Sequence, residues 1–264
     1  MAAATFTYES IWRDSQRGNW RVRDLIGPDK PMDFRRPFLP DSIARVADIN
    51  GNVFATQALL GFAEEEGKHI YMFQEFMAAF KRGFHHRCDC VGPLEELAQT
   101  ILAYPPLSVL LLTLQFEWTT QIHYLESVRH QSESLDPCFC DLLKYHWMEE
   151  AQHTKLDALL AYELVQLMPA DAVETAIEGY FELVQLLEQT LMTQVKLDID
   201  SLMQAMARTL NKADQGHLQS AQAQAYRWSF LCAGVGHPNF IGVLDQISPA
   251  AKQRAISLAK VLSH

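Results

Sequence analysis

The sequence lacks several features that point to particular classes of protein. Val/Ile-rich alternating runs joined by hairpin turns are missing, which argues against a β-sheet protein. No internal repeat or low-complexity tract occurs. Basic residues are in the minority: 22 Lys and Arg stand against 32 Asp and Glu, and the net charge is −10. A nucleic-acid partner is therefore not expected, because phosphate binding requires positive charge.

A long hydrophobic run is also missing. The most apolar stretch, residues 107–116, is interrupted by Ser108, Thr113 and Gln115 and is too short to span a bilayer. The first ten residues, MAAATFTYES, do not combine a basic segment with an apolar one, as a signal peptide does. We therefore expect a cytoplasmic protein that does not associate with membranes.

Cysteine is sparse, with five residues in 264. Four of them form two Cys-x-Cys pairs: Cys88/Cys90 and Cys138/Cys140. In a reducing compartment these residues are expected to be free thiols. The alternative is a zinc site built from both pairs with His85 or His86, although the usual spacing for zinc is Cys-x2-Cys.

Apolar residues recur at helical spacing along nearly the whole chain, which predicts an all-α fold of long helices. Short loops between long helices are typical of a helical bundle. We expect one helical-bundle domain over residues 41–264, preceded by an arm over residues 1–40 that packs on it. Helices are expected at 41–82 (with a break near 50–52), 94–104, 107–130, from QSESLDP to about 168, 171–203, 214–233 and 249–262. Asp171 is expected to cap the helix that follows it, and GVGHPNF to form a loop.

Three of these helices carry ionisable side chains on faces that should be buried. In HWMEEAQH, residues 146–153, the stripe that holds His146, Glu150 and His153 also holds Leu160. These positions are three, four or seven residues apart, so they lie on one face of a helix. The stripe is otherwise apolar, which predicts that the two imidazoles and the carboxylate point into the protein.

The same anomaly occurs on two other helices. In FAEEEGKHIYMFQEF, residues 62–76, Glu66 and His69 share a face with Phe62 and Phe73. In LLLTLQFEWTTQIHYL, residues 110–125, Glu117 aligns with leucines. The acids beside these positions should be solvated: two of the run Glu64-Glu65-Glu66, and Glu149 next to Glu150.

Three buried and unpaired carboxylates would cost several kcal/mol each. No Lys or Arg shares the three stripes, so ion pairing is not the expected remedy. A pair of divalent cations would keep the carboxylates ionised and would take the imidazoles as neutral ligands. Carboxylate and imidazole donors with open positions suit iron or manganese better than zinc or calcium.

The order Glu66-x-x-His69, Glu117, Glu150-x-x-His153 resembles the ferritin-like di-metal carboxylate proteins, over about residues 54–168. The resemblance implies a ferritin-like bundle with additional C-terminal helices. It also implies that Glu66 and Glu150 bridge two iron ions, with manganese as the alternative metal. Glu117, His69 and His153 would then be terminal ligands.

Two further groups are expected near the metal ions. Asp157, one turn past His153, would accept an imidazole N–H from a ligand on another helix. Tyr124 would lie beside the site on the helix of Glu117. The upstream glutamate helix of the ferritin-like order has no counterpart. The alternatives for the missing ligand are water, hydroxide or His146, or a residue of a second copy of the chain in a homodimer. A degenerate site is the remaining alternative.

The pattern His146-x3-Glu150-x2-His153 is similar to that of aryl-amine N-oxygenases of the p-aminobenzoate N-oxygenase type. The resemblance implies a di-iron or Fe/Mn oxidoreductase that activates O2 and oxidises a small organic substrate, with amine N-oxygenation as the expected reaction. An electron donor, which the sequence does not identify, would be a partner. No catalytic residue is expected beyond the metal ligands. The alternatives are a ferroxidase-type or degenerate ferritin-like protein without oxygenase activity, and a metal-free helical interaction protein.

Overall fold

The computed structural model describes residues 7–15, 53–84, 86, 88–130, 134–206 and 210–263. These residues form helices and no strand, so the prediction of an all-α fold is confirmed. No helix in these ranges is long and apolar enough to cross a bilayer. The ferritin-like arrangement of the helices stays a prediction. Most of the predicted arm over residues 1–40 lies outside the described residues.

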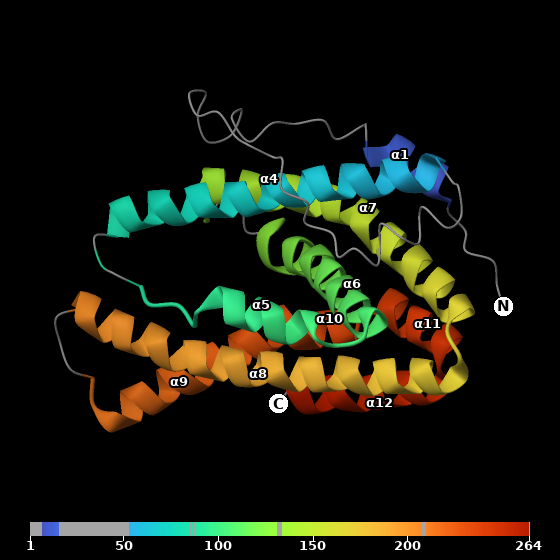
Figure 1. Ribbon diagram of the computed structural model, residues 1–264. Coiled ribbons are helices and arrows are strands. Elements are labelled where there is room, and N and C mark those ends of the chain that lie inside the picture. Colours follow the sequence, from blue (N-terminus) through green and yellow to red (C-terminus); the bar gives the residue numbers. More distant parts are fainter. Residues whose placement is uncertain are drawn as a thin grey trace. The chain divides into compact units, whose positions relative to one another are not determined.

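The chain divides into two compact units, residues 1–79 with 120–167 and residues 80–119 with 168–264. The first unit holds α1 (Tyr8–Ser15), most of α4 (Val53–Phe84), the end of α6 (Pro106–His123), the π-helical turn η2 (Tyr124–Val128) and α7 (Pro137–Leu167). The two long helices α4 and α7 lie side by side (Figure 1). Helix α1 packs on α7, where the Tyr8 hydroxyl donates a hydrogen bond to Glu163 Oε2 at 2.6 Å.

The second unit holds α5 (Leu94–Leu102), the first part of α6, α8 (Ala170–Met206), α9 (Lys212–Arg227), η3 (Trp228–Cys232), α10 (Ala233–Val235), α11 (Pro238–Ile247) and α12 (Pro249–Leu262). Helix α8 packs against α9, and α12 packs against α11 and η3. Tyr180 of α8 is fully buried and donates to Gln115 Oε1 of α6 at 2.7 Å.

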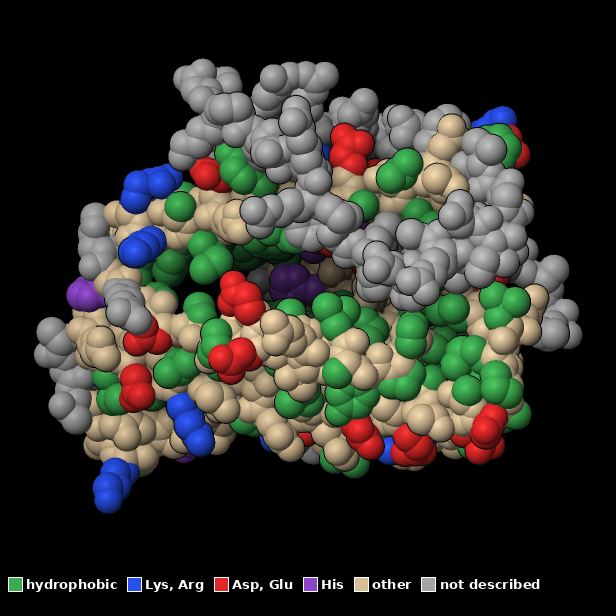
Figure 2. Space-filling view, viewed as in Figure 1, with side chains coloured by type: hydrophobic (Ala, Val, Ile, Leu, Met, Phe, Trp, Pro, Cys, Tyr) green, Lys and Arg blue, Asp and Glu red, His purple; other side chains and the backbone are tan. Residues whose placement is uncertain are grey.

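Helix α8 shows the amphipathic pattern that its sequence predicts. Ile177, Tyr180 and Val184 are buried. The acids on the opposite face are exposed: Glu174, Glu178 and Glu182. Acidic side chains accordingly appear on the surface over α8 (Figure 2). These glutamates are solvated and need no metal ion.

The boundaries differ from the predicted ones at two places. Helix α8 begins at Ala170, so Asp171 lies within its first turn, where a carboxylate still interacts favourably with the helix dipole. The segment GVGHPNF, predicted as a loop, contains the end of α10 and the start of α11. His237 caps α11, because its Nδ1 accepts the N–H of Asn239 at 3.2 Å, and Pro238 is suited to the first helical position.

The predicted helices over 107–130 and 214–233 both contain a π-helical turn. In η2 the N–H of Arg129 donates to the carbonyl of Tyr124 at 2.9 Å, five residues back along the chain. Such turns hold one residue more than an α-helical turn and are frequent near functional sites. The apolar spacing in the sequence did not reveal either turn.

Gly234 permits close packing of α10 on α6 within the second unit. A Cβ atom at this position would lie too close to the carbonyl oxygen of Gln115 and to Thr119 Oγ1. We expect Gly234→Ala to lower the free energy of unfolding in urea by about 2 kcal/mol, because a backbone must shift. Gly216→Ala on α9 is the control. Open space surrounds that position, so alanine should be neutral or stabilise the helix by up to about 1 kcal/mol. Equal stabilities of the two variants would contradict the packing argument.

Candidate metal centre

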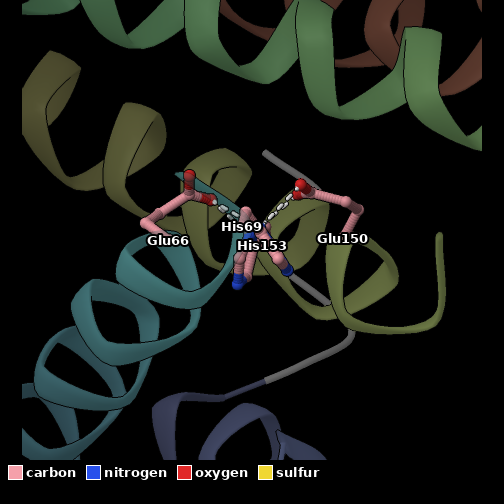
Figure 3. Close-up of side chains that lie close together, drawn as sticks. All are labelled: Glu66, His69, Glu150 and His153. Atoms are coloured by element: carbon pink, nitrogen blue, oxygen red, sulfur yellow. Dashed lines mark hydrogen bonds and ion pairs between the residues drawn. The ribbon is translucent and has the colours of Figure 1, made fainter. Parts of the chain in front are cut away.

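Four of the side chains singled out in the sequence come together between α4 and α7. Glu66 and His69 extend from α4, and Glu150 and His153 from α7 (Figure 3). Each of them offers one ligand atom, and these atoms all lie within 4.8 Å of one another. Glu150, His69 and His153 are buried, and Glu66 is 29% exposed. A metal ion could be held here.

Among the described residues, no other group of three or more His, Cys, Asp or Glu side chains has its ligand atoms placed so that they could hold a metal ion. The alternative zinc site therefore gains no support from the cysteine pairs, whose four thiols are free. Cys88, Cys90 and Cys138 are exposed. His85 lies outside the described residues.

Glu66 and Glu150 each contact both histidines. His153 Nδ1 lies 2.9 Å from Glu66 Oε1 and 2.8 Å from Glu150 Oε2. His69 Nδ1 lies 3.2 Å from Glu150 Oε1 and 3.7 Å from Glu66 Oε1. The buried His69 Nδ1 has no partner in hydrogen-bond geometry among the described residues, so it is available as a ligand atom. The two carboxylates thus lie between the two imidazoles, as bridging ligands would.

The other nitrogen of each ring is bound to a carboxylate from the opposite helix. His69 Nε2 of α4 donates to Glu149 Oε2 of α7 at 3.0 Å. His153 Nε2 of α7 donates to Glu65 Oε2 of α4 at 2.9 Å. The arrangement is reciprocal, and it directs both Nδ1 atoms toward Glu66 and Glu150. Carboxylates that hold metal-binding imidazoles in this way fix the tautomer and the orientation of the ring.

The prediction that Glu149 and two of the three consecutive glutamates are solvated is wrong. Glu149 is 3% exposed and Glu65 is 8% exposed, so only Glu64 of the run lies exposed on the surface. Each buried acid lies one position before the metal-facing glutamate, about 100° around its helix, a flank that the opposite helix covers. The repeated sequence Glu-Glu-x-x-His, at 65–69 and 149–153, is the signal that could have revealed both residues.

Lys68 balances one of these two buried acids, Glu149, which belongs to none of the three predicted stripes. The ammonium group of Lys68 forms an ion pair with Glu149 Oε1, and its side chain is 14% exposed. Lys68 lies one residue before His69, outside the stripe on which the prediction was based. Ion pairing thus compensates part of the buried charge.

His146 also lies at the site. Its Nε2 is 2.5 Å from Glu150 Oε1, and its ring packs edge-to-face on His69 with 4.4 Å between centroids. The ring of Phe73 also packs edge-to-face with the His146 ring, with 5.1 Å between centroids. His146 is outside the group of four, but its contact with Glu150 keeps the predicted triplet His146, Glu150 and His153 together.

The structure brings the three remaining predicted residues to different places. Asp157 is buried near His153, but its Oδ2 has no hydrogen-bond partner among the described residues. The role expected of Asp157 is filled by Glu65 and Glu149. Tyr124 stacks on Trp147, with 4.8 Å between centroids. Glu117 is buried on α6 in the second unit, and its role as a ligand stays a prediction.

The site holds its charges as ion pairs. Burial alone would lower the pKa of His69 and His153, but their carboxylate contacts outweigh it and raise both values well above normal. Burial would raise the pKa of Glu66, but His153 and His69 lower it to about 2. The metal-free site thus favours protonated imidazoles and ionised glutamates, which are the charges that bound cations would replace.

Comparisons with family profiles, curated proteins and solved structures found no match.

Asp157 provides a test of the charge in this site. Burial, together with Glu66 and Glu150, raises its pKa well above 3.8, against the opposing effect of His153. Unfolded chains lose the Asp157 proton at lower pH than folded ones, so this group costs stability increasingly as the pH rises above 3.8. In chelator-treated protein we expect Asp157→Asn to raise the free energy of unfolding by about 1 kcal/mol or more at pH 7.

The gain from Asp157→Asn should shrink as the pH falls toward 4.5. Denaturant unfolding at several pH values measures this gain. Asp141→Asn is the matched control, since Asp141 lies exposed on the same helix and should give no pH-dependent gain. A gain of equal size at pH 4.5 and pH 7 would show that the charge of Asp157 is not responsible.

Proposed function

We propose that this chain is a di-iron carboxylate oxidoreductase that uses O2 to oxidise a small organic substrate. The observation that carries this proposal is the group of Glu66, His69, Glu150 and His153, whose ligand atoms lie within 4.8 Å of one another. Mixed carboxylate and imidazole donors suit iron or manganese. The reciprocal contacts of Glu65 and Glu149 support the proposal, because they orient both imidazoles toward one point.

The charge of the site supports two cations rather than one. We define the acid–histidine cluster as Glu65, Glu66, Lys68, His69, His146, Glu149, Glu150, His153 and Asp157. With neutral imidazoles and ionised acids, its five carboxylates and one ammonium group leave four negative charges. Most of these groups are buried, where uncompensated charge is costly. Two divalent ions would neutralise the cluster, and a single one would leave two negative charges.

The contacts suggest which atoms would hold the ions. Glu66 and Glu150, each in contact with both Nδ1 atoms, would be shared between the two ions. His69 and His153 would each complete one position through Nδ1. His146, beside His69 and Glu150, would add a further nitrogen.

A bound ferrous pair would supply electrons for the reduction of O2. The residues of the chain would orient the ligands and exclude water. Phe62 packs on His153 with 4.4 Å between centroids, and Phe73 covers His146. An aromatic amine is the substrate class that we propose, because His146 takes part in the site as the His-x3-Glu-x2-His pattern requires.

Metal loading and O2 consumption test this function. Anaerobic loading with Fe²⁺ should give two irons per chain, and the loaded protein should consume O2 faster when an aryl amine and a reductant are present. Glu150→Ala should reduce iron to less than about one per chain, because it removes a shared ligand. The measurements are iron content after desalting and O2 uptake at an electrode.

Glu64→Ala is the matched control for these experiments. Glu64 lies on α4 in the same run of glutamates but is exposed, so this variant should bind iron as wild type does. Absence of iron in wild type would refute the proposal. Two irons whose oxidation is unaffected by the amine would instead support the ferroxidase-type alternative.

A further inference from the structure

The two halves of the acid–histidine cluster are alike in their hydrogen bonds but not in their charge. At the His69 end, the orienting carboxylate of Glu149 is also paired with the Lys68 ammonium group. The negative charge of Glu149 is therefore largely balanced before any metal ion binds. The imidazole of His146, which adds no negative charge, also lies at this end.

The His153 end carries more negative charge. Its orienting carboxylate, Glu65, contacts His153 and is 8% exposed. Asp157, which is 1% exposed, lies close enough to interact electrostatically with His153, and its Oδ2 lacks a hydrogen-bond partner among the described residues. Among the described residues, and apart from the shared Glu66 and Glu150, two acids thus lie near His153, whereas one acid and one ammonium group lie near His69.

This difference acts directly on a divalent ion. A unit charge within about 10 Å of such an ion changes its affinity by about tenfold or more where the effective dielectric constant is about 20. Lys68 opposes a cation near His69, and Asp157 attracts one near His153. Both effects favour the same end, since Glu66 and Glu150 are common to the two positions.

We propose that the two metal positions fill in sequence, first at His153 and then at His69, and that Lys68 sets the difference between them. This inference rests on the proposed di-metal function. The position at His153 acts as the high-affinity site and remains occupied at low metal concentration. The position at His69 fills only at higher concentration, so Lys68 determines the concentration at which the pair is complete.

Titration with Mn²⁺ tests the proposal, with the free ion measured by its EPR signal. Wild type should bind two ions in two steps that differ at least about tenfold in Kd. Lys68→Met removes the charge but keeps an aliphatic side chain, and it should strengthen the second step by about tenfold or more. Glu65→Gln should weaken the first step by a similar factor. Circular dichroism and thermal unfolding establish that each variant folds.

Lys144→Met is the matched control, because it removes a positive charge from an exposed position of α7. Both steps should then stay within about twofold of wild type. Two equal steps in wild type, or an unchanged second step in folded Lys68→Met, would overturn the sequential order while leaving the di-metal site intact. If wild type binds no Mn²⁺ or Fe²⁺, the proposed function itself fails. Because Glu65→Gln acts on the other end, it tests the order even if Lys68→Met does not fold.

Discussion

The first unit depends on how several neighbouring carboxylates are accommodated between two helices. Glu65, Glu66, Glu149 and Glu150 meet where α4 lies beside α7, and three of the four are almost fully buried. Neighbouring carboxylates repel one another strongly in a low-dielectric interior. The helices can pack here only because imidazoles and an ammonium group face the acids. The orientation of the two imidazoles follows from their contacts with these acids.

The solution is a set of crossed contacts. Each helix supplies a histidine, and each histidine is held by a glutamate of the other helix. Neither helix alone can complete the site. The distances between its side chains therefore depend on the register of α4 against α7. Glu66 and Glu150 each contact both imidazoles, and these contacts stabilise the same register. These contacts fix the directions of the side chains in the group that could hold a metal ion.

Much of this could be predicted from the sequence, and the exceptions have physical causes. The helical class and the convergence of Glu66, His69, Glu150 and His153 followed from spacing, because a stripe of one helix must face another element. Glu65, Lys68 and Glu149 were missed because they lie on the flanks of the stripe. Only the width of the helix–helix contact decides whether flanking residues are buried, and a single helix pattern does not contain that information. The helix α11 and both π-helical turns depend on local hydrogen bonds that the spacing of apolar residues does not encode.

The π-helical turn at the end of α6 has a consequence for the position of His146. The wider turn presents the ring of Tyr124 to Trp147, and one turn earlier Gln121 Nε2 donates to the carbonyl of Trp147 at 3.0 Å. Trp147 is thereby held at both its ring and its backbone. These contacts also restrain His146, which precedes Trp147 in the chain. A one-residue deletion in the turn would disturb these two contacts of Trp147. The disturbance would reach His146 through the backbone of α7.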